Sequence, residues 1–413
     1  MKNIKLTFLL LIAFYFSFHF VIPAVCYWKL GYVSTYNANV LDFQSMRIGF
    51  LLNFTSLFVG GIAIAVTPTK KIVPPVWKEK NSLIFLLLSL FFTVGVFLTN
   101  LDFFDSLKTS LTRHDYWVFG EMFFNLDFYI LFAMTYSFNF ISESQLFYVF
   151  IKILSAARSA PLVLFHYGMC SIASPVAIKY RKKIIVYLVI SFAFSIFGFN
   201  WATKIRNEKI TGEIVTNQPM GHRLSQTVTV SHQLFYQILG RISYLENAML
   251  PIHFKDDPKR SEIFKNKYSF KRQMELFINN IVPGDIFEFD VYPNQYYRAA
   301  FMNMSVAQAK EFYTSVNLTL PVYFYMYSNF VVSCLASSVV IWIYFVVTSA
   351  FFKLHPLLGM GWLATFYPGL LTFFDFVMIG KALVLIAIST GLFLVLARIN
   401  LRAILGRWGR VED

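Results

Sequence analysis

Long apolar blocks recur along this chain, and they constrain its fold more than any other feature. Each block runs for about 17–25 residues, the length that an α-helix needs to cross the hydrocarbon core of a bilayer. Hydrophobic residues make up 57% of the 413 residues, and charged residues only 14%. A soluble domain does not have that balance. The sequence therefore predicts an all-α polytopic membrane protein.

About ten membrane spans can be placed on these blocks. The first block could be a signal peptide, because it follows Lys2 and Lys5. It is long for such a peptide, however, and no small-x-small cleavage site stands out, so we interpret it as a retained span. The predicted spans lie at roughly 5–25, 47–67, 82–99, 118–140, 143–157, 160–178, 184–202, 322–348, 355–374 and 377–397.

Basic residues in the loops predict the orientation of the spans. Lys and Arg gather at 70–80, at 179–183 and at 398–410, and short loops with such an excess face the cytoplasm. With about ten spans and a cytoplasmic N-terminus, all three stretches fall on the cytoplasmic side. The expected units are a membrane domain of about seven helices at 1–202, a large, mainly helical outer loop domain at 203–321, the last three membrane helices at 322–397, and a basic cytoplasmic tail at 398–413.

The formal net charge of +14 does not indicate nucleic-acid binding, because Lys and Arg cluster at the ends of apolar blocks and encode orientation there. The three cysteines, Cys26, Cys170 and Cys334, are far apart and predict neither a disulfide framework nor a metal site. The sequence also lacks a phosphate-cradling glycine loop, an HExxH motif and a GxSxG elbow. An ATP-driven pump and a membrane metalloprotease therefore have little support.

An amphipathic helix is expected inside the outer loop domain. Between 227 and 249 apolar residues recur every three or four positions, and Pro251 ends the pattern. Arg241 and Tyr244 lie on the second, more polar face of this helix. A further helical stretch is expected at 261–282.

Charged residues at the apolar blocks are the first candidates for function. Arg158 lies between two blocks, at the expected outer membrane boundary. It could hold a phosphate through two parallel hydrogen bonds, or simply extend its guanidinium to the interface. Asp127 and Lys152 fall at comparable depths in their spans, and intramembrane charges are usually paired or functional. A buried structural pair is the interpretation that we favour for these two.

The outer loop domain carries further candidates. His222, next to Arg223, titrates near neutrality and could act as a general base on a hydroxyl. Arg241 could point into a cavity beneath the amphipathic helix, or could instead form an ion pair with Glu246. The acidic and aromatic stretch at 285–298 favours a strand or an extended loop over a metal site, although Glu288 and Asp290 could together bind a divalent ion.

Four segments carry a resemblance to a known family. They are LGRISYLENAML at 239–250, YSFKRQMELFINNIVPG at 268–284, SAARSAPLV at 155–163 and NLTLPVYFYMYSNF at 317–330. Together with about ten spans and a long outer loop before the last three, they resemble the Wzy-type O-antigen and capsular polysaccharide polymerases. The resemblance covers most of the chain from about residue 118 onward.

The resemblance implies a bacterial glycosyltransferase of the inner membrane, with both termini cytoplasmic and an active site that faces the periplasm. Such an enzyme transfers a glycan from an undecaprenyl-diphosphate-linked donor to a sugar hydroxyl of another lipid-linked repeat unit. Its partners would be the lipid-linked donor and acceptor, membrane lipids and a chain-length regulator protein, with no nucleic acid. No cofactor and no metal are expected.

The resemblance also carries the family's essential arginines onto Arg158 and Arg241. These would grip the diphosphate, whose negative charge grows as the glycosidic bond breaks. His222, and after it Glu246, are the candidate bases for the acceptor hydroxyl. The supporting candidates, for the diphosphate and for stacking on sugars, are Arg223, Arg298, Tyr244 and Tyr296.

Three other functions stay open from the sequence. An O-antigen ligase has a similar architecture, but it transfers the finished glycan to the lipid A core. A flippase or transporter of lipid-linked oligosaccharide would be expected to show pseudo-symmetric halves and many polar groups within its spans. A non-catalytic receptor or assembly protein would use the outer loop domain as its binding module. Polar residues here concentrate in one asymmetric outer domain, which favours an enzyme.

Overall fold

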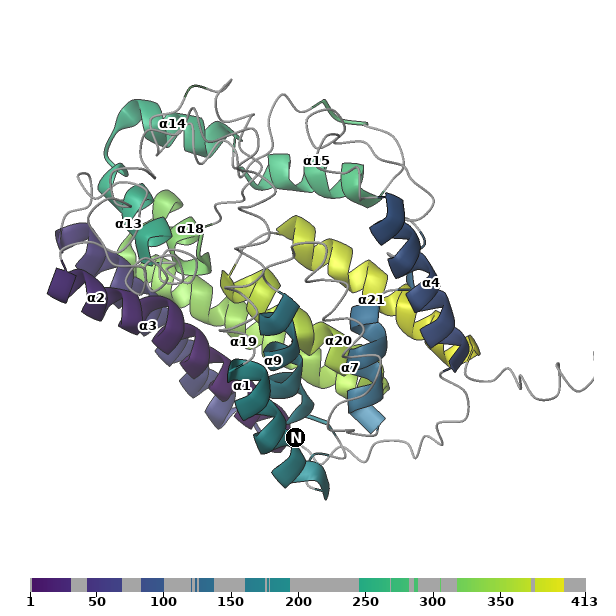
Figure 1. The fold of residues 1–413 in the computed structure, drawn as a ribbon. Helices are drawn as coiled ribbons and strands as arrows, with labels where there is room; N and C mark the ends of the chain where they lie inside the picture. Colours follow the sequence, from purple (N-terminus) through teal and green to yellow (C-terminus); the bar gives the residue numbers. More distant parts are fainter. Residues whose placement is uncertain are drawn as a thin grey trace, which may run out of the picture.

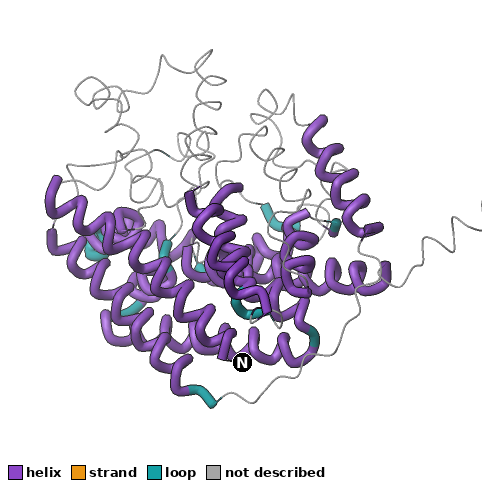
Figure 2. The backbone as a smooth tube through the Cα atoms, turned by 60° about the horizontal axis from the view of Figure 1, so that its bottom comes forward, coloured by secondary structure: helices purple, strands orange, loops and turns teal. Residues whose placement is uncertain are grey.

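The structure is a computed structural model, and the part of the chain that it describes is helical and contains no strand (Figure 2). Apart from the single residues 120, 177 and 305, the described ranges are 2–30, 43–68, 83–99, 123–124, 126–136, 160–174, 179–193, 245–267, 269–281, 286–288, 318–372 and 376–396.

The first predicted span is one continuous helix. It consists of α1 (Lys2–Phe16), a π-helical stretch η1 (Ser17–Val21) and α2 (Ile22–Leu30). Pro23 lies two residues after the end of η1, and a proline has no N–H to bond the carbonyl four residues earlier. Such a gap in the hydrogen-bond ladder disturbs the regular α geometry, which accounts for the π-helical stretch.

Among the described residues, four helices are long and apolar enough to cross a membrane. They are Asn3–Trp28, α3 (Phe43–Val66), α19 (Phe330–Leu354) and Ile379–Leu396, which lies within α21 (Phe376–Leu396). The predicted spans at 5–25, 47–67 and 377–397 coincide with three of them. The count of about ten spans and the outer location of 203–321 stay predictions.

Shorter helices occupy several of the other predicted spans. These are α4 (Leu83–Thr99), α7 (Leu126–Tyr136) and α9 (Ala160–Ser171), at the spans predicted for 82–99, 118–140 and 160–178. The span predicted at 355–374 forms α20 (Pro356–Thr365) followed by the π-helical η2 (Phe366–Thr372). The span predicted at 143–157 lies outside the described residues.

The prediction of one continuous span at 322–348 is wrong. The chain instead forms a short helix, α18 (Leu320–Tyr327), and then breaks at Ser328–Asn329 before α19 begins. Asn329 starts the new helix, because its side-chain oxygen accepts a hydrogen bond from the Val332 N–H at 3.0 Å. Hydrophobicity alone did not reveal this break, since apolar residues flank it on both sides.

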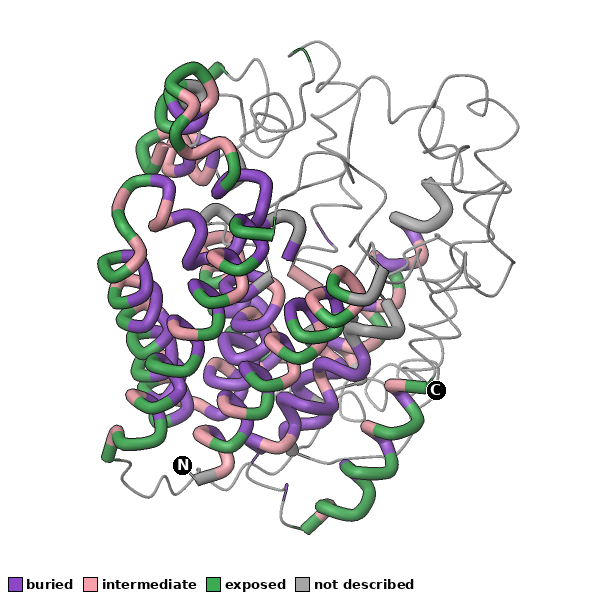
Figure 3. The backbone as a smooth tube through the Cα atoms, turned by 90° about the vertical axis from the view of Figure 1, so that its left-hand side faces the viewer, coloured by how far each residue is buried: buried purple, intermediate pink, exposed green. Residues whose placement is uncertain are grey.

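Small residues let α3 and α19 pack closely side by side (Figure 1). A Cβ atom at Gly60 would lie 3.1 Å from the Ile341 side chain. The Ser338 hydroxyl donates to the Ser56 carbonyl at 2.9 Å. Close approach at small residues and hydrogen bonds between helices are the usual forces that join helices in a membrane. Figure 3 shows the inward sides of these helices buried and their outer sides exposed.

Three helices from the predicted outer loop domain gather at the end of the molecule opposite the N-terminus (Figure 1). They are α13 (Leu245–His253), α14 (Pro258–Lys267) and α15 (Phe270–Ile281). Two details of the prediction are corrected. Pro251 does not end the first helix, because Leu250 and Ile252 are buried and hold the last turn in place. The stretch 261–282 is divided near Ser269, whose hydroxyl accepts a hydrogen bond from the Arg272 N–H at 3.4 Å.

Candidate functional site

Most residues of the predicted site lie outside the described residues. Glu246 is the exception, and it occupies the first turn of α13. Asp127 lies in α7, whereas Lys152, its predicted partner, is outside the described residues. Glu288 is described and exposed, but Asp290 is not described. The predicted site residues outside the described part are Arg158, His222, Arg223, Arg241, Tyr244, Tyr296 and Arg298.

The apolar face of α13 packs this part of the loop segment against α3. Leu245, Ala248 and Met249 are fully buried. A Cβ atom at Gly49 of α3 would lie 3.4 Å from the side chains of both Ala248 and Ile252. Burial of Leu245 and Met249 agrees with the apolar face that the spacing predicts. Ala248 departs from the prediction, because the spacing places it on the second, more polar face with Arg241 and Tyr244, yet it is buried against Gly49. The predicted part of this helix before Leu245 lies outside the described residues.

A lysine joins the turn after α13 to the break between α18 and α19. The Lys255 ammonium donates to the Ser328 carbonyl at 2.6 Å and lies 3.6 Å from the centre of the Tyr325 ring. The carbonyl at this helix break therefore receives a donor from another element. Burial is the main cause that lowers the pKa of Lys255, while Asp256 opposes this shift and Lys265 adds to it.

A second cation orders the start of α14. Asp257 accepts a hydrogen bond from the Arg260 N–H at 3.2 Å, and its other oxygen lies 3.2 Å from Arg260 Nε. The Arg260 guanidinium also stacks on the Phe254 ring, with its central carbon 3.7 Å from the ring centre. Each of these two cations thus lies over an aromatic ring at the same end of the molecule.

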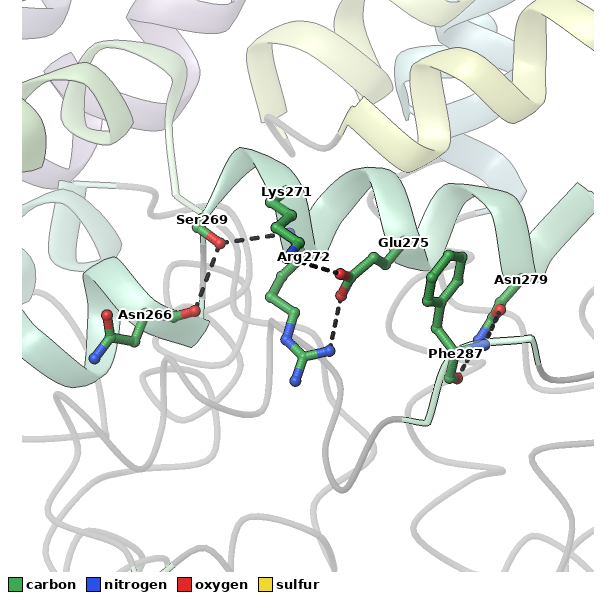
Figure 4. Close-up of polar contacts among 7 residues, drawn as sticks. All are labelled: Asn266, Ser269, Lys271, Arg272, Glu275, Asn279 and Phe287. Atoms are coloured by element: carbon green, nitrogen blue, oxygen red, sulfur yellow. Dashed lines mark hydrogen bonds and ion pairs between the residues drawn. The ribbon is translucent and has the colours of Figure 1, made fainter.

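Helix α15 carries its own polar network on the face away from α21 (Figure 4). Glu275 contacts Arg272 at 2.7 Å and Lys271 at 4.0 Å. Asn279 exchanges two hydrogen bonds with the backbone of Phe287, at 2.6 and 3.0 Å, and so ties Phe287 to the last turn of the helix.

The apolar face of α15 lies on α21, and the contact depends on a glycine. A Cβ atom at Gly380 would lie 2.3 Å from the Phe277 ring, so no larger residue fits there without movement. Lys381 follows at the next position, inside the apolar segment Ile379–Leu396, and is partly buried. Our sequence reasoning missed this residue, although a charge inside an apolar block is the signal that identified Asp127 and Lys152.

A buried polar cluster in the membrane region was also missed. His19 of η1 is hydrogen-bonded to the hydroxyl of Tyr367 in η2, so the two π-helical stretches meet. The ring of His166, from α9, lies 5.3 Å from that of Tyr367. His166 Nε2 lies 2.8 Å from the Ala364 carbonyl, which can only accept, so Nε2 carries the proton.

Pro368 explains why the Ala364 carbonyl needs a hydrogen-bond donor from His166. In a regular α-helix the Ala364 carbonyl would accept from the N–H of residue 368, but proline has none. His166 supplies the missing donor from a neighbouring helix. A comparable bond joins α19 to α20, because the Tyr344 hydroxyl donates to the Trp362 carbonyl at 2.9 Å.

The described residues thus offer two polar regions with different chemistry. Cations at the end opposite the N-terminus could bind an anionic group, and Arg272, Lys255, Arg260 and Lys381 supply them. Histidines and tyrosines in the interior could exchange protons. Within the described ranges, no group of three or more His, Cys, Asp or Glu residues is placed to hold a metal ion.

No protein-family model, no curated protein sequence and no solved structure matches this chain.

Proposed function

We propose that this chain is a polymerase of bacterial surface polysaccharide. It would transfer a glycan from an undecaprenyl-diphosphate-linked donor to a sugar hydroxyl of a lipid-linked repeat unit. One observation carries the proposal most. Amphipathic helices of the loop segment, α13 and α15, lie against the ends of α3 and α21 with their apolar faces, opposite the N-terminus (Figure 1). A reaction on a lipid-linked sugar needs such a surface, where the lipid stays in the membrane and the sugar reaches water.

The topology is part of the proposal. In it, about ten spans cross the inner membrane, both termini are cytoplasmic, and 203–321 forms a periplasmic loop domain. The gathering of α13, α14 and α15 at one end of the molecule supports a single polar face for the reaction. The basic stretches at 70–80, 179–183 and 398–410 would lie on the opposite, cytoplasmic face.

The proposed mechanism uses arginines to stabilise the leaving diphosphate. Arg158 and Arg241 would contact its oxygens, and this contact strengthens as negative charge develops and water is excluded. His222 would remove the proton from the acceptor hydroxyl, with Glu246 as the second candidate base. The acceptor oxygen then bonds to the anomeric carbon, and undecaprenyl diphosphate leaves with the electron pair of the broken bond.

Arg241 provides the sharpest test of this mechanism. We predict that Arg241→Ala abolishes chain elongation while the amount of protein in the membrane stays unchanged. Lys265→Ala is a suitable control, because Lys265 is an exposed cation of the same loop segment with no role in the mechanism. Surface glycan length, read on a gel, is the measurement. Elongation at the wild-type level in Arg241→Ala would show that the diphosphate contact is wrong.

The buried histidine cluster favours a second candidate, a flippase or transporter of lipid-linked oligosaccharide. Ionisable side chains inside a membrane protein often form proton relays, and His19, Tyr367 and His166 meet in the membrane region. The two candidates differ in a reconstituted system. A transporter moves a fluorescent lipid-linked oligosaccharide across the bilayer of a proteoliposome, whereas the polymerase lengthens the glycan and moves none.

A further inference from the structure

The last apolar helix contains a cation, Lys381, that has no ion-pair partner among the described residues. Lys381 is the third residue of the segment Ile379–Leu396, which is long and apolar enough to cross a membrane. The whole of α21, from 376 to 396, contains no acidic residue. A charged side chain within a membrane span is costly unless an opposite charge or water compensates it. The retention of a lysine here therefore calls for a counter-charge.

The described neighbours of Lys381 do not supply that counter-charge. Helix α15 lies on this part of α21 and contains one acidic residue, Glu275. Glu275 is already engaged by Arg272 at 2.7 Å and by Lys271 at 4.0 Å. Within the described ranges, no carboxylate lies within ion-pair distance of Lys381.

Lys381 lies close to the N-terminal end of the last apolar helix. It is the sixth residue of α21, so its Cα lies about 7–8 Å along the helix axis from that of Phe376. A lysine at this depth can keep its stem in the apolar region and bring its ammonium to the membrane boundary. Phe277 of α15 packs on the adjacent Gly380, so this boundary lies beneath the amphipathic helix.

We propose that Lys381 binds the phosphate group of a membrane lipid at the end of α21 that α15 covers. A phosphate is the anion that a membrane boundary provides, and a lysine binds it as a point charge. Two lipids offer this chemistry, namely undecaprenyl diphosphate and the headgroup of a glycerophospholipid. The first deepens the proposed polymerase function and rests on it, because undecaprenyl diphosphate is the leaving group of that reaction.

Binding to the full-length chain in phosphatidylcholine nanodiscs tests the site. One arm measures the Kd of undecaprenyl diphosphate, and the other arm measures the Kd of phosphatidylglycerol. We expect Lys381→Met to raise the Kd at least tenfold in one or both arms, and Lys381→Arg to change it little. Lys353→Met is the matched control, because Lys353 is an exposed cation in the last turn of α19. The control should bind like the wild type.

The Kd values of the Lys381 variants support or overturn the proposed phosphate site. A Kd that Lys381→Met leaves unchanged in both arms overturns the proposal, provided that the variant melts like the wild type. If Lys381→Met does not fold, Lys381→Gln replaces it. Weaker binding by folded Lys381→Gln supports the proposal, and wild-type binding by it overturns the proposal. A change with undecaprenyl diphosphate alone indicates a site for the leaving group of the polymerase reaction, and a change with phosphatidylglycerol indicates a headgroup site. If binding depends on Lys381 but a strain without the protein keeps its normal glycan lengths, the site stands and the polymerase function fails.

Discussion

Prolines lie close to both buried histidines of the interior, His19 and His166, or to the segments that they contact. Pro368 leaves the Ala364 carbonyl without its regular donor, and His166 donates to that carbonyl from α9 at 2.8 Å. Pro23 lies two residues after η1 and likewise lacks an N–H for the carbonyl of residue 19. His19 is hydrogen-bonded through its side chain to Tyr367. The buried histidines therefore bond to segments in which proline has disturbed the helix.

A double-mutant cycle tests the link between His166 and Pro368. His166→Phe should destabilise the protein by about 1–3 kcal/mol, because a buried carbonyl loses its donor. In a Pro368→Ala background the cost should be smaller, since residue 368 regains an N–H that can reach Ala364. Unfolding of the four detergent-solubilised proteins gives the coupling free energy. An equal cost of His166→Phe in both backgrounds would mean that His166 acts through packing alone.

At the scale of the helices, α15 packs on α21 where α21 has a small residue. Gly380 of α21 leaves room for the Phe277 ring, and a Cβ atom there would lie 2.3 Å away from it. Helix α21 also contains Gly391, where an added Cβ atom would meet no other atom within 4 Å. These two glycines form a matched pair for testing how α15 is held.

Gly380→Leu should displace α15 and lower stability by about 1–3 kcal/mol, as overpacking does at a tight contact. Gly391→Leu should have little effect, because the space around it is open. Phe277→Ala should restore part of the stability lost in Gly380→Leu. Thermal melting together with limited proteolysis of the 270–281 segment provides the measurement. Equal behaviour of both glycine variants would mean that the contact does not hold the helix.

The break between α18 and α19 shows what hydrophobicity cannot predict about an element. Residues on both sides of Ser328–Asn329 are apolar, so a window of hydropathy joins them into one span. The break depends on local hydrogen bonds instead, namely the Asn329 cap and the Lys255 contact to Ser328. Lys255 is 73 residues away in sequence, so its contribution follows from tertiary packing alone.

For the whole molecule, the sequence was sufficient to predict the helical character and the apolar membrane-length helices of the described part, together with the helices α13, α14 and α15. Length and hydropathy determine those features directly. The buried cluster of His19, Tyr367 and His166 could not be predicted from the sequence, because His19 and Tyr367 are 348 residues apart and no local pattern pairs them. Lys381 was within reach, since it is visible as a charge inside an apolar block. Of the predicted catalytic residues only Glu246 lies in the described part, and the roles of all of them stay predictions.

The orientation of the whole molecule is open to direct labelling. In a background without the native cysteines, we predict that Lys265→Cys reacts with a membrane-impermeant maleimide added to intact spheroplasts. Lys182→Cys should react only after permeabilisation, because the basic stretch at 179–183 is predicted to be cytoplasmic. Both positions are exposed, so accessibility within the protein does not bias the comparison. Labelling of both residues from the same side would refute the proposed topology.

The polymerase function itself is tested most directly by the surface glycan profile of a strain that lacks this protein. A polymerase joins repeat units after the first has been made, so its loss leaves single units available for attachment. We predict that long glycan chains disappear while a single repeat unit remains attached at the cell surface. A surface with no glycan at all would instead indicate a ligase or a flippase, and an unchanged ladder of long chains would contradict the proposed function.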